Sequence, residues 1–345
     1  MLKKIHCLLP ALCVVFILAS TPAAPAELPT YDFVWAHPFP ASHHHNVDII
    51  KPLVEELREK SGGRINIEVV PGGAITTGQS AVDDVTSGAV DIVWNLQGST
   101  PGRFPLTEML EFPGMFVSSE HTTQVIWDLF EQSEAFRREY GDYKVFCMYS
   151  ADMGDLHNNL RPIRRPEDVA GLNLRAASPT VERTMIAYGA NTINMPMPEA
   201  YDNIDKGVVN GLSTGFSAIP TYRLYEVIKY STHGLNLYAS PQYFAMSLNA
   251  WNSLHPDDQA LFDSLTGREY SLKAGRYYDN LNVPAVAASR ERGVEVYELT
   301  DKDLAAFREK SDPMVKRFIA EMNGRGYDAQ GFYDLIVSLA EKRRP

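Results

Sequence analysis

The segment Gly171-Leu-Asn-Leu-Arg-Ala-Ala-Ser-Pro179 predicts a short β-strand that runs directly into a helix. Leu172 and Leu174 alternate with Asn173, as in a strand. Ser178-Pro179 is typical of a helix start, with serine as the N-cap and proline at the first helical position. Arg175 is therefore expected at the carboxyl end of a strand, the edge at which open α/β sheets bind their ligands.

Arg175 also has the chemistry of a carboxylate receptor. Its guanidinium is expected to face the free backbone N–H groups of the helix that follows, and both groups attract anions. The alternative is a surface arginine paired with Glu182 or Glu167, an arrangement that stabilises a protein little.

The sequence before this segment alternates strand and helix patterns, which predicts an α/β fold with a parallel sheet. Strands are expected at residues 31–36, 64–70 and 90–94, a helix at 43–61 that ends at Gly62-Gly63, and another from about residue 79. Residues 80–91 and 199–210 resemble each other, since each reads as a helix that ends in glycine and continues into a strand. We therefore expect two related lobes around a shared cleft, where small ligands usually bind.

The rest of the chain is expected to be mostly helical. A long helix is predicted from residue 254 to about 290, bent at Pro284. Further helices are predicted from residue 300 and over 330–342. An apolar strand is predicted at 143–149; Cys147 lies within it and is expected to be a buried structural thiol.

Residues 1–26 have the pattern of a secretory signal peptide. Lys3 and Lys4 precede an apolar run at 8–18, and Ala24-Pro25-Ala26 resembles a cleavage site. We expect export to the periplasm, with no direct insertion into the membrane after cleavage. Cys7 and Cys13 would leave with this segment, so Cys147 could form no intramolecular disulfide.

The formal net charge of the chain is −11, and removal of Lys3 and Lys4 makes the mature chain two units more negative. Such a charge argues against nucleic acid or an anionic membrane as a partner. It would also repel an anionic ligand at long range, so any anion site must be local and strong.

Three segments resemble the periplasmic solute-binding proteins of TRAP transporters, the DctP family. They are Arg161-Pro-Ile-Arg-Arg-Pro-Glu-Asp-Val-Ala-Gly-Leu-Asn-Leu-Arg175, Tyr188-Gly-Ala-Asn-Thr-Ile-Asn-Met-Pro-Met-Pro-Glu-Ala-Tyr201 and Lys206-Gly-Val-Val-Asn-Gly211. The resemblance implies a type II-like periplasmic-binding-protein fold with a long helix spanning both lobes and a helical C-terminus. It also implies an organic acid in the cleft, delivery to the TRAP permease, no cofactor and no catalysis. Lobe I is expected at 27–150 plus about 240–280, and lobe II at 151–239 plus about 281–345.

The resemblance also implies a set of ligand-binding residues. Arg175 matches the family arginine that grips the substrate carboxylate, and Leu156 stands where many members carry a second arginine. One cation with apolar walls suits a monocarboxylate with an apolar or aromatic body. Trp35 and Phe39 could also lie around the site. The expected ligand-binding residues are Arg175, Trp94, Asn95, Ser178, Met197, Thr214, Phe216, His37, Thr77 and Tyr243.

Motifs in the sequence are compatible with two other functions. His37 with His43-His44-His45 could bind a divalent metal, although no carboxylate stands at a ligand spacing beside them. Gly211-Leu-Ser-Thr-Gly215 matches the nucleophile elbow of serine hydrolases, which requires a strand before the serine, a helix after it, and then an acid and a histidine in chain order. Pro220 would interrupt that helix, and the only acid between the motif and the last histidine, His255, is Glu226.

Overall fold

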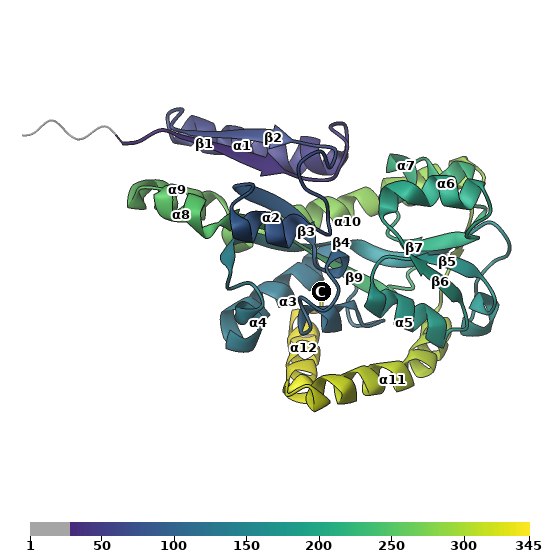
Figure 1. Cartoon of the computed structure of the whole chain (residues 1–345). Helices are drawn as coiled ribbons and strands as arrows, with labels where there is room; N and C mark the ends of the chain where they lie inside the picture. Colours follow the sequence, from purple (N-terminus) through teal and green to yellow (C-terminus); the bar gives the residue numbers. More distant parts are fainter. Residues whose placement is uncertain (1–27) are drawn as a thin grey trace, which may run out of the picture.

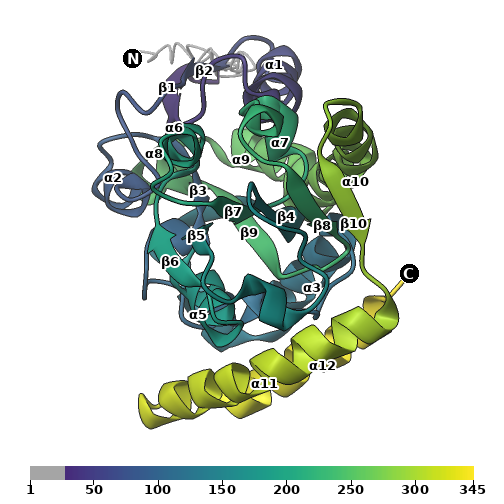
Figure 2. The same cartoon turned by 90° about the vertical axis from the view of Figure 1, so that its right-hand side faces the viewer.

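The computed structural model describes residues 28–345, and the signal peptide predicted at 1–26, with Cys7 and Cys13, lies outside the described residues. Helices and strands alternate around one central sheet (Figures 1 and 2). None of the helices within residues 28–345 combines the length and the apolar character needed to cross a bilayer.

The sheet has ten strands, with the order β2-β1-β3-β9-β4-β7-β5-β6, while β8 pairs with β4 and β10. The pairing is parallel where β1 lies beside β2 and β3, and where β5 lies beside β6 and β7, as the strand–helix alternation predicted. The strands are β1 Tyr31–Ala36, β2 Ile65–Val70, β3 Ile92–Leu96, β4 Tyr143–Asn158, β5 Asn173–Ala176, β6 Asn191–Asn194, β7 Gly211–Thr214, β8 Tyr230–His233, β9 Tyr238–Ser247 and β10 Glu295–Glu298.

Helices cover both faces of this sheet (Figure 1). The α-helices are α1 Lys51–Lys60, α2 Ala81–Ser87, α3 Ser119–Gln132, α4 Glu134–Arg138, α5 Pro179–Ala187, α6 Ala200–Asp205, α7 Ala218–Thr221, α8 Leu248–Ser253, α9 Pro256–Leu265, α10 Gly267–Glu291, α11 Asp301–Gly324 and α12 Ala329–Arg343. The shorter helical turns are η1 His45–Ile50, η2 Gln97–Ser99, η3 Thr107–Glu111, η4 Pro166–Val169, η5 Met197–Glu199 and η6 Leu224–Glu226.

Two long antiparallel strands, β4 and β9, join the two ends of the sheet. We call the part with β1, β2 and β3 the first half, and the part with β5, β6, β7, β8 and β10 the second half (Figure 1). β4 pairs with β9 along its first part and with β7 and β8 at its end, so it is much longer than the predicted 143–149. A bulge between Ala151 and Gly154 interrupts its pairing where the halves meet.

The helix predicted from 254 to 290 is two helices, α9 and α10. They separate at Thr266 and Gly267, and Gly267 has φ +72°, a conformation that favours glycine. Pro284 lies inside α10. α10 contacts α3 and β4 as well as α7 and β10, so a long helix does span both halves, as predicted.

The last helix packs against the first half. Phe332, Ile336 and Leu339 of α12 belong to the same buried core as Val125 and Leu129 of α3. The lobe bounds inferred from the sequence stay a prediction.

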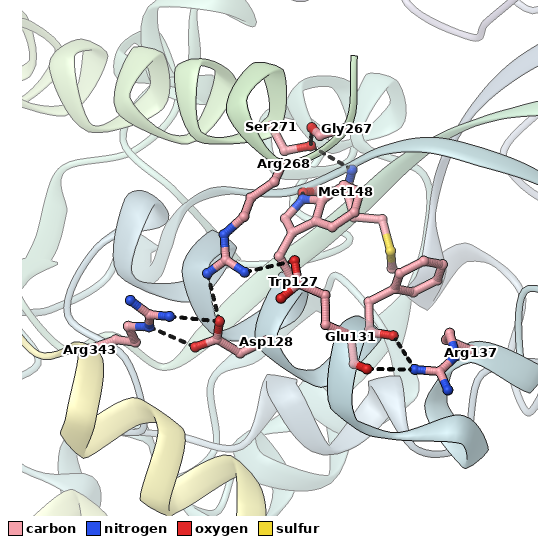
Figure 3. A network of polar contacts seen from close by, with 10 residues as sticks. Trp127, Asp128, Glu131, Arg137, Met148, Gly267, Arg268, Ser271 and Arg343 are labelled. Atoms are coloured by element: carbon pink, nitrogen blue, oxygen red, sulfur yellow. Dashed lines mark hydrogen bonds and ion pairs between the residues drawn. The ribbon is translucent and has the colours of Figure 1, made fainter. Parts of the chain in front are cut away.

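A buried carboxylate ties α12 to the first half (Figure 3). Asp128 of α3 is almost fully buried and accepts hydrogen bonds from Arg268 of α10, at 2.6 Å, and from Arg343 of α12, at 2.7 and 2.9 Å. These bonds hold the pKa of Asp128 below its usual value despite its burial. Three helices far apart in sequence are thereby joined at one point.

Candidate functional site

A cavity of about 130 Å³ lies where the two halves and the crossing strands meet. The first half contributes Phe39, His43, His44, Trp94 and Leu96. The crossing strands contribute Ala151, Asp152, Tyr238, Ser240 and Gln242. The second half contributes Arg175, Ala177, Met197, Thr214, Gly215, Ser217, Ala218 and Tyr222. The helix α10 contributes Tyr278.

Arg175 is the cation of this cavity. It lies on β5 and is 5% exposed. Its Nε donates to the carbonyl oxygen of Met195 at 2.9 Å, and its Nη1 donates to that of Ser213 at 3.1 Å. These bonds fix the plane of the guanidinium, while no bond from Nη2 is formed within residues 28–345.

No carboxylate of the described residues neutralises this arginine. Burial lowers the pKa of Arg175, and the groups that oppose this shift are the phenols of Tyr238 and Tyr222. Glu182, a suggested partner, instead accepts a hydrogen bond from Thr192. The alternative of a paired surface arginine is therefore wrong. A buried cation without a protein partner is costly unless something pairs with it.

Aromatic rings form the wall contributed by the first half. The Phe39 ring lies 4.2 Å from the Trp94 ring and is stacked on His43 at 4.4 Å, measured between centroids. The His43 ring lies 5.8 Å from Tyr222 of the second half. The cavity is thus lined by aromatic rings from both halves, which suit a flat apolar ligand.

Polar groups of the wall are held in place by neighbours. The indole Nε1 of Trp94 donates to Gln242 Oε1 at 3.0 Å. The carboxylate of Asp152 accepts hydrogen bonds from the backbone N–H and the hydroxyl of Ser217, at 2.8 and 2.7 Å. Burial raises the pKa of Asp152 to about 6.

The histidine run lies in and behind this wall. Burial lowers the pKa of His43 to about 3 and that of His44 to about 4, so both are neutral at neutral pH. His45 is fully buried and hydrogen-bonds to the hydroxyls of Tyr149 and Tyr278, while His37 hydrogen-bonds to Asn46. Over residues 28–345, no three His, Cys, Asp or Glu side chains are arranged to hold a metal.

Four of the residues expected to bind the ligand line the cavity, namely Arg175, Trp94, Met197 and Thr214. Phe39, which the sequence suggested as a neighbour of the site, lines it too. The other six lie outside the lining. Asn95, Tyr243 and His37 are buried behind the first-half wall, Thr77 is in an exposed turn, Phe216 is in the second-half core, and Ser178 caps α5.

Ser178 and Phe216 have clear structural partners. The Ser178 hydroxyl accepts from the N–H of Val181, as an N-cap does, and donates to the buried carboxyl of Glu111 in η3. Phe216 packs edge-on against His157 and His233. Trp35, another suggested neighbour of the site, is fully buried in the first-half core.

The nucleophile-elbow motif has the wrong structure. β7 begins at Gly211, so Ser213 lies within the strand and not on the turn after it. Its side chain is fully buried, and its hydroxyl donates to the carbonyl oxygen of Arg175. An elbow would expose the serine at a strand-to-helix turn.

Leu156, which stands where many relatives carry a second arginine, is fully buried in the second-half core.

The sequence reasoning missed several lining residues, among them Asp152, Tyr222, Tyr238, Gln242 and Tyr278. One signal could have found two of them. Tyr238, Ser240 and Gln242 are spaced by two along β9, so they share one face of that strand.

Comparison with known proteins identifies the family and the fold of this chain. A sequence model of the family described as "Bacterial extracellular solute-binding protein, family 7" (DctP) matches residues 36–322. The 2,3-diketo-L-gulonate-binding periplasmic protein YiaO of Escherichia coli is 23% identical over 284 residues, which cover 81% of this chain and 84% of YiaO.

Solved structures of TRAP solute-binding proteins share the fold. One, from a marine metagenome and an unidentified microbe, is described as specific for aromatic acid ligands and was solved with meta-hydroxyphenylacetate and with 3-hydroxybenzoate. It is 26% identical to this chain, with a TM-score of 0.87, and in the first complex the match covers 91% of this chain and 99% of that one. Another, from Rhodoferax ferrireducens, is 23% identical with a TM-score of 0.86, over 91% and 98% of the two chains.

Proposed function

The chain belongs to the bacterial extracellular solute-binding proteins of family 7, the DctP family of TRAP transporters, and we propose that it binds an aromatic monocarboxylate between its two halves. Members of this family and their structural neighbours are solute-binding proteins, not enzymes. The observation that carries the proposal is the buried, unpaired guanidinium of Arg175 in a cavity with aromatic walls.

The charge of the cavity favours one carboxylate. Arg175 is the only lysine or arginine among the lining residues of the described chain, and the histidines beside it are neutral. Arg175 can offer Nη2 and the second hydrogen of Nη1 to a carboxylate. A second ligand carboxylate would have no cation and would lie near Asp152.

The size and walls of the cavity favour a single aromatic ring. Its volume of about 130 Å³ is comparable to an engineered protein cavity of about 150 Å³ that takes up benzene. The aromatic rings of Phe39, Trp94 and Tyr222 line the space for such a ligand. The marine relative described as specific for aromatic acids, at 26% identity, adds support for this ligand class.

Binding between the halves gives a mechanism for signalling occupancy. A ligand that touches both halves only when they are close shifts the population toward the closed form. Closure removes water from the guanidinium and carboxylate, which strengthens their attraction. We propose that a TRAP permease recognises this closed form, and that the protein acts in the periplasm after cleavage of residues 1–26.

A thermal-shift screen of the chain without residues 1–26 tests this proposal. The panel contains benzoate and other aromatic monocarboxylates, aliphatic monocarboxylates, dicarboxylates and uronates, each with and without EDTA. We expect aromatic monocarboxylates to raise the melting temperature most, because a ligand that binds only the folded state stabilises it. EDTA should change nothing.

Two outcomes would contradict the proposal. Stabilisation by uronates or dicarboxylates alone would mean that another group replaces the cation missing at Leu156. Stabilisation by zinc alone, abolished by EDTA, would instead assign the function to His37 and His43-His44-His45. The variant Arg175→Met serves as the negative control for each ligand that raises the melting temperature.

A further inference from the structure

Asp152 places a buried carboxylate in the wall of the same cavity as Arg175. It lies on β4 at the bulge between Ala151 and Gly154 and is 5% exposed. Its partners among the described residues are the backbone N–H and hydroxyl of Ser217 and its own backbone N–H, and no lysine or arginine pairs with it. A buried carboxylate with no cation requires an explanation, since such groups are costly.

The surrounding chain is built to accommodate this carboxylate. A Cβ atom on Gly215 would lie 2.3 Å from the Asp152 carboxyl carbon and Oδ1, so no other residue fits there without displacing it. Ser217 uses both its donors to orient the two oxygens. A carboxylate offers about four acceptor positions, and Ser217 and the backbone N–H of Asp152 use three of them, so about one position remains for a ligand donor.

The cavity therefore contains one cation and one carboxylate, each without an ionic partner in the described chain. A ligand that complements both must carry a carboxylate for Arg175 and a hydrogen-bond donor for Asp152. A plain aromatic acid would cover the Asp152 carboxylate without replacing the water that it loses, and an unsatisfied buried acceptor weakens binding.

We propose that Asp152 accepts a hydrogen bond from a hydroxyl group on the ligand, so that the preferred ligands are hydroxylated aromatic monocarboxylates. This inference rests on the proposed function, because it requires that Arg175 holds the ligand carboxylate. A hydroxyl supplies one donor, which matches the acceptor position left on Asp152, whereas an ammonium group has three donors to satisfy. At neutral pH the carboxylate is mostly ionised, with its pKa raised to about 6, and can accept this bond.

Isothermal titration calorimetry at about pH 7.5, well above that pKa, tests the inference on the wild-type protein. The ligands are benzoate, the three hydroxybenzoates, the corresponding methoxybenzoates, which keep the oxygen but lack the donor, and the aromatic α-amino acids phenylalanine and tyrosine. We expect one hydroxybenzoate to bind at least about tenfold more tightly than both benzoate and its own methyl ether, since a hydrogen bond to a charged group is lost in the other two.

The variant Asp152→Asn tests the residue. An amide has the same shape but a single oxygen, which the backbone N–H of Ser217 would occupy, so its NH₂ group would face the ligand hydroxyl. The preference for the hydroxybenzoate over its methyl ether should fall from about tenfold or more toward one. Asp83→Asn, the same charge change on an exposed residue of α2, should leave the preference intact.

The outcomes separate the two proposals. If benzoate and its hydroxylated and methoxylated forms bind equally to the wild type, or if Asp152→Asn keeps the preference, the role of Asp152 is refuted while aromatic carboxylate binding stands. Binding only of aromatic α-amino acids would also refute the hydroxyl, in favour of an ammonium group at Asp152. If no aromatic carboxylate binds, the proposed function itself fails. The wild-type series decides the matter even if Asp152→Asn does not fold.

Discussion

Replacing Arg175 by methionine removes the cation of the cavity and keeps an unbranched side chain of similar length. We expect the Kd for the best aromatic monocarboxylate to rise at least about thirtyfold, because removing one partner of a buried, hydrogen-bonded charge pair costs about 2 to 5 kcal/mol and about 1.4 kcal/mol corresponds to a tenfold change. Arg175 is 5% exposed, so water cannot take its place.

The hydrogen bonds of Arg175 explain why lysine should not replace it. The carbonyl oxygens of Met195 and Ser213 hold Nε and Nη1 at 2.9 and 3.1 Å, so the guanidinium is ordered before the ligand arrives. Preorganisation removes part of the entropic cost of binding. A lysine ammonium cannot bond to both carbonyls and still present a planar fork. Arg175→Lys should therefore lose about tenfold or more.

Isothermal titration calorimetry of the three proteins measures these losses, with thermal melts of the ligand-free proteins to show that each is folded. Arg183→Met is the matched control, because Arg183 of α5 forms an exposed ion pair with Glu321. Its affinity should stay within about twofold of the wild type, since exposed pairs contribute little. If Arg175→Met bound the ligand within about threefold of the wild type, the assignment of the carboxylate site would be refuted.

Three further predictions concern stability and specificity. Asp128→Asn should lower the free energy of unfolding by about 1 to 3 kcal/mol, because Arg268 and Arg343 lose their shared carboxylate. Urea unfolding measures this loss. The control Glu134→Gln should show no measurable loss, because the ion pair of Glu134 with Arg138 is exposed. Burial raises the pKa of Glu111 to about 8 from its usual 4.5, so its contribution to stability is fully present below about pH 4.5 and is lost as the pH rises through about 8. The decline in stability between about pH 5.5 and about pH 8.5 should therefore be shallower in Glu111→Gln, and equal slopes for the two proteins would contradict a raised pKa. Ser213→Ala should keep the ligand affinity, measured by calorimetry, within about threefold of the wild type, because the backbone carbonyl of Ser213, not its hydroxyl, accepts the hydrogen bond from Arg175. A loss of affinity as large as that of Arg175→Met would contradict this account.

Local patterns predicted the elements on which the site depends. The alternation of Leu172 and Leu174 and the Ser178-Pro179 helix start give β5 and α5 as observed, with Ser178 as the N-cap. Gly88 and Gly207 end their helices in the left-handed conformation, as the repeated pattern predicted. The break at Gly267 was missed, because a glycine within an otherwise helical pattern does not by itself reveal its φ.

The remaining part of the site depends on contacts between distant segments. Asp152 lines the cavity at a bulge in β4, and Tyr278 of α10 lines it from more than a hundred residues later in the chain. Nothing local in the sequence marks either position. Hydrophobicity likewise cannot distinguish an aromatic residue of the core from one of the cleft. Phe216 and Tyr243, which were expected at the site, are buried in cores, whereas Tyr222 and Tyr238 line the cavity.

A crystal structure of the complex with the most stabilising aromatic acid tests the central claim most directly. The account predicts the ligand carboxylate within hydrogen-bonding distance of the Arg175 guanidinium, and the ligand ring among Phe39, Trp94 and Tyr222. A ligand bound in another cavity, or one whose carboxylate points away from Arg175, would contradict it.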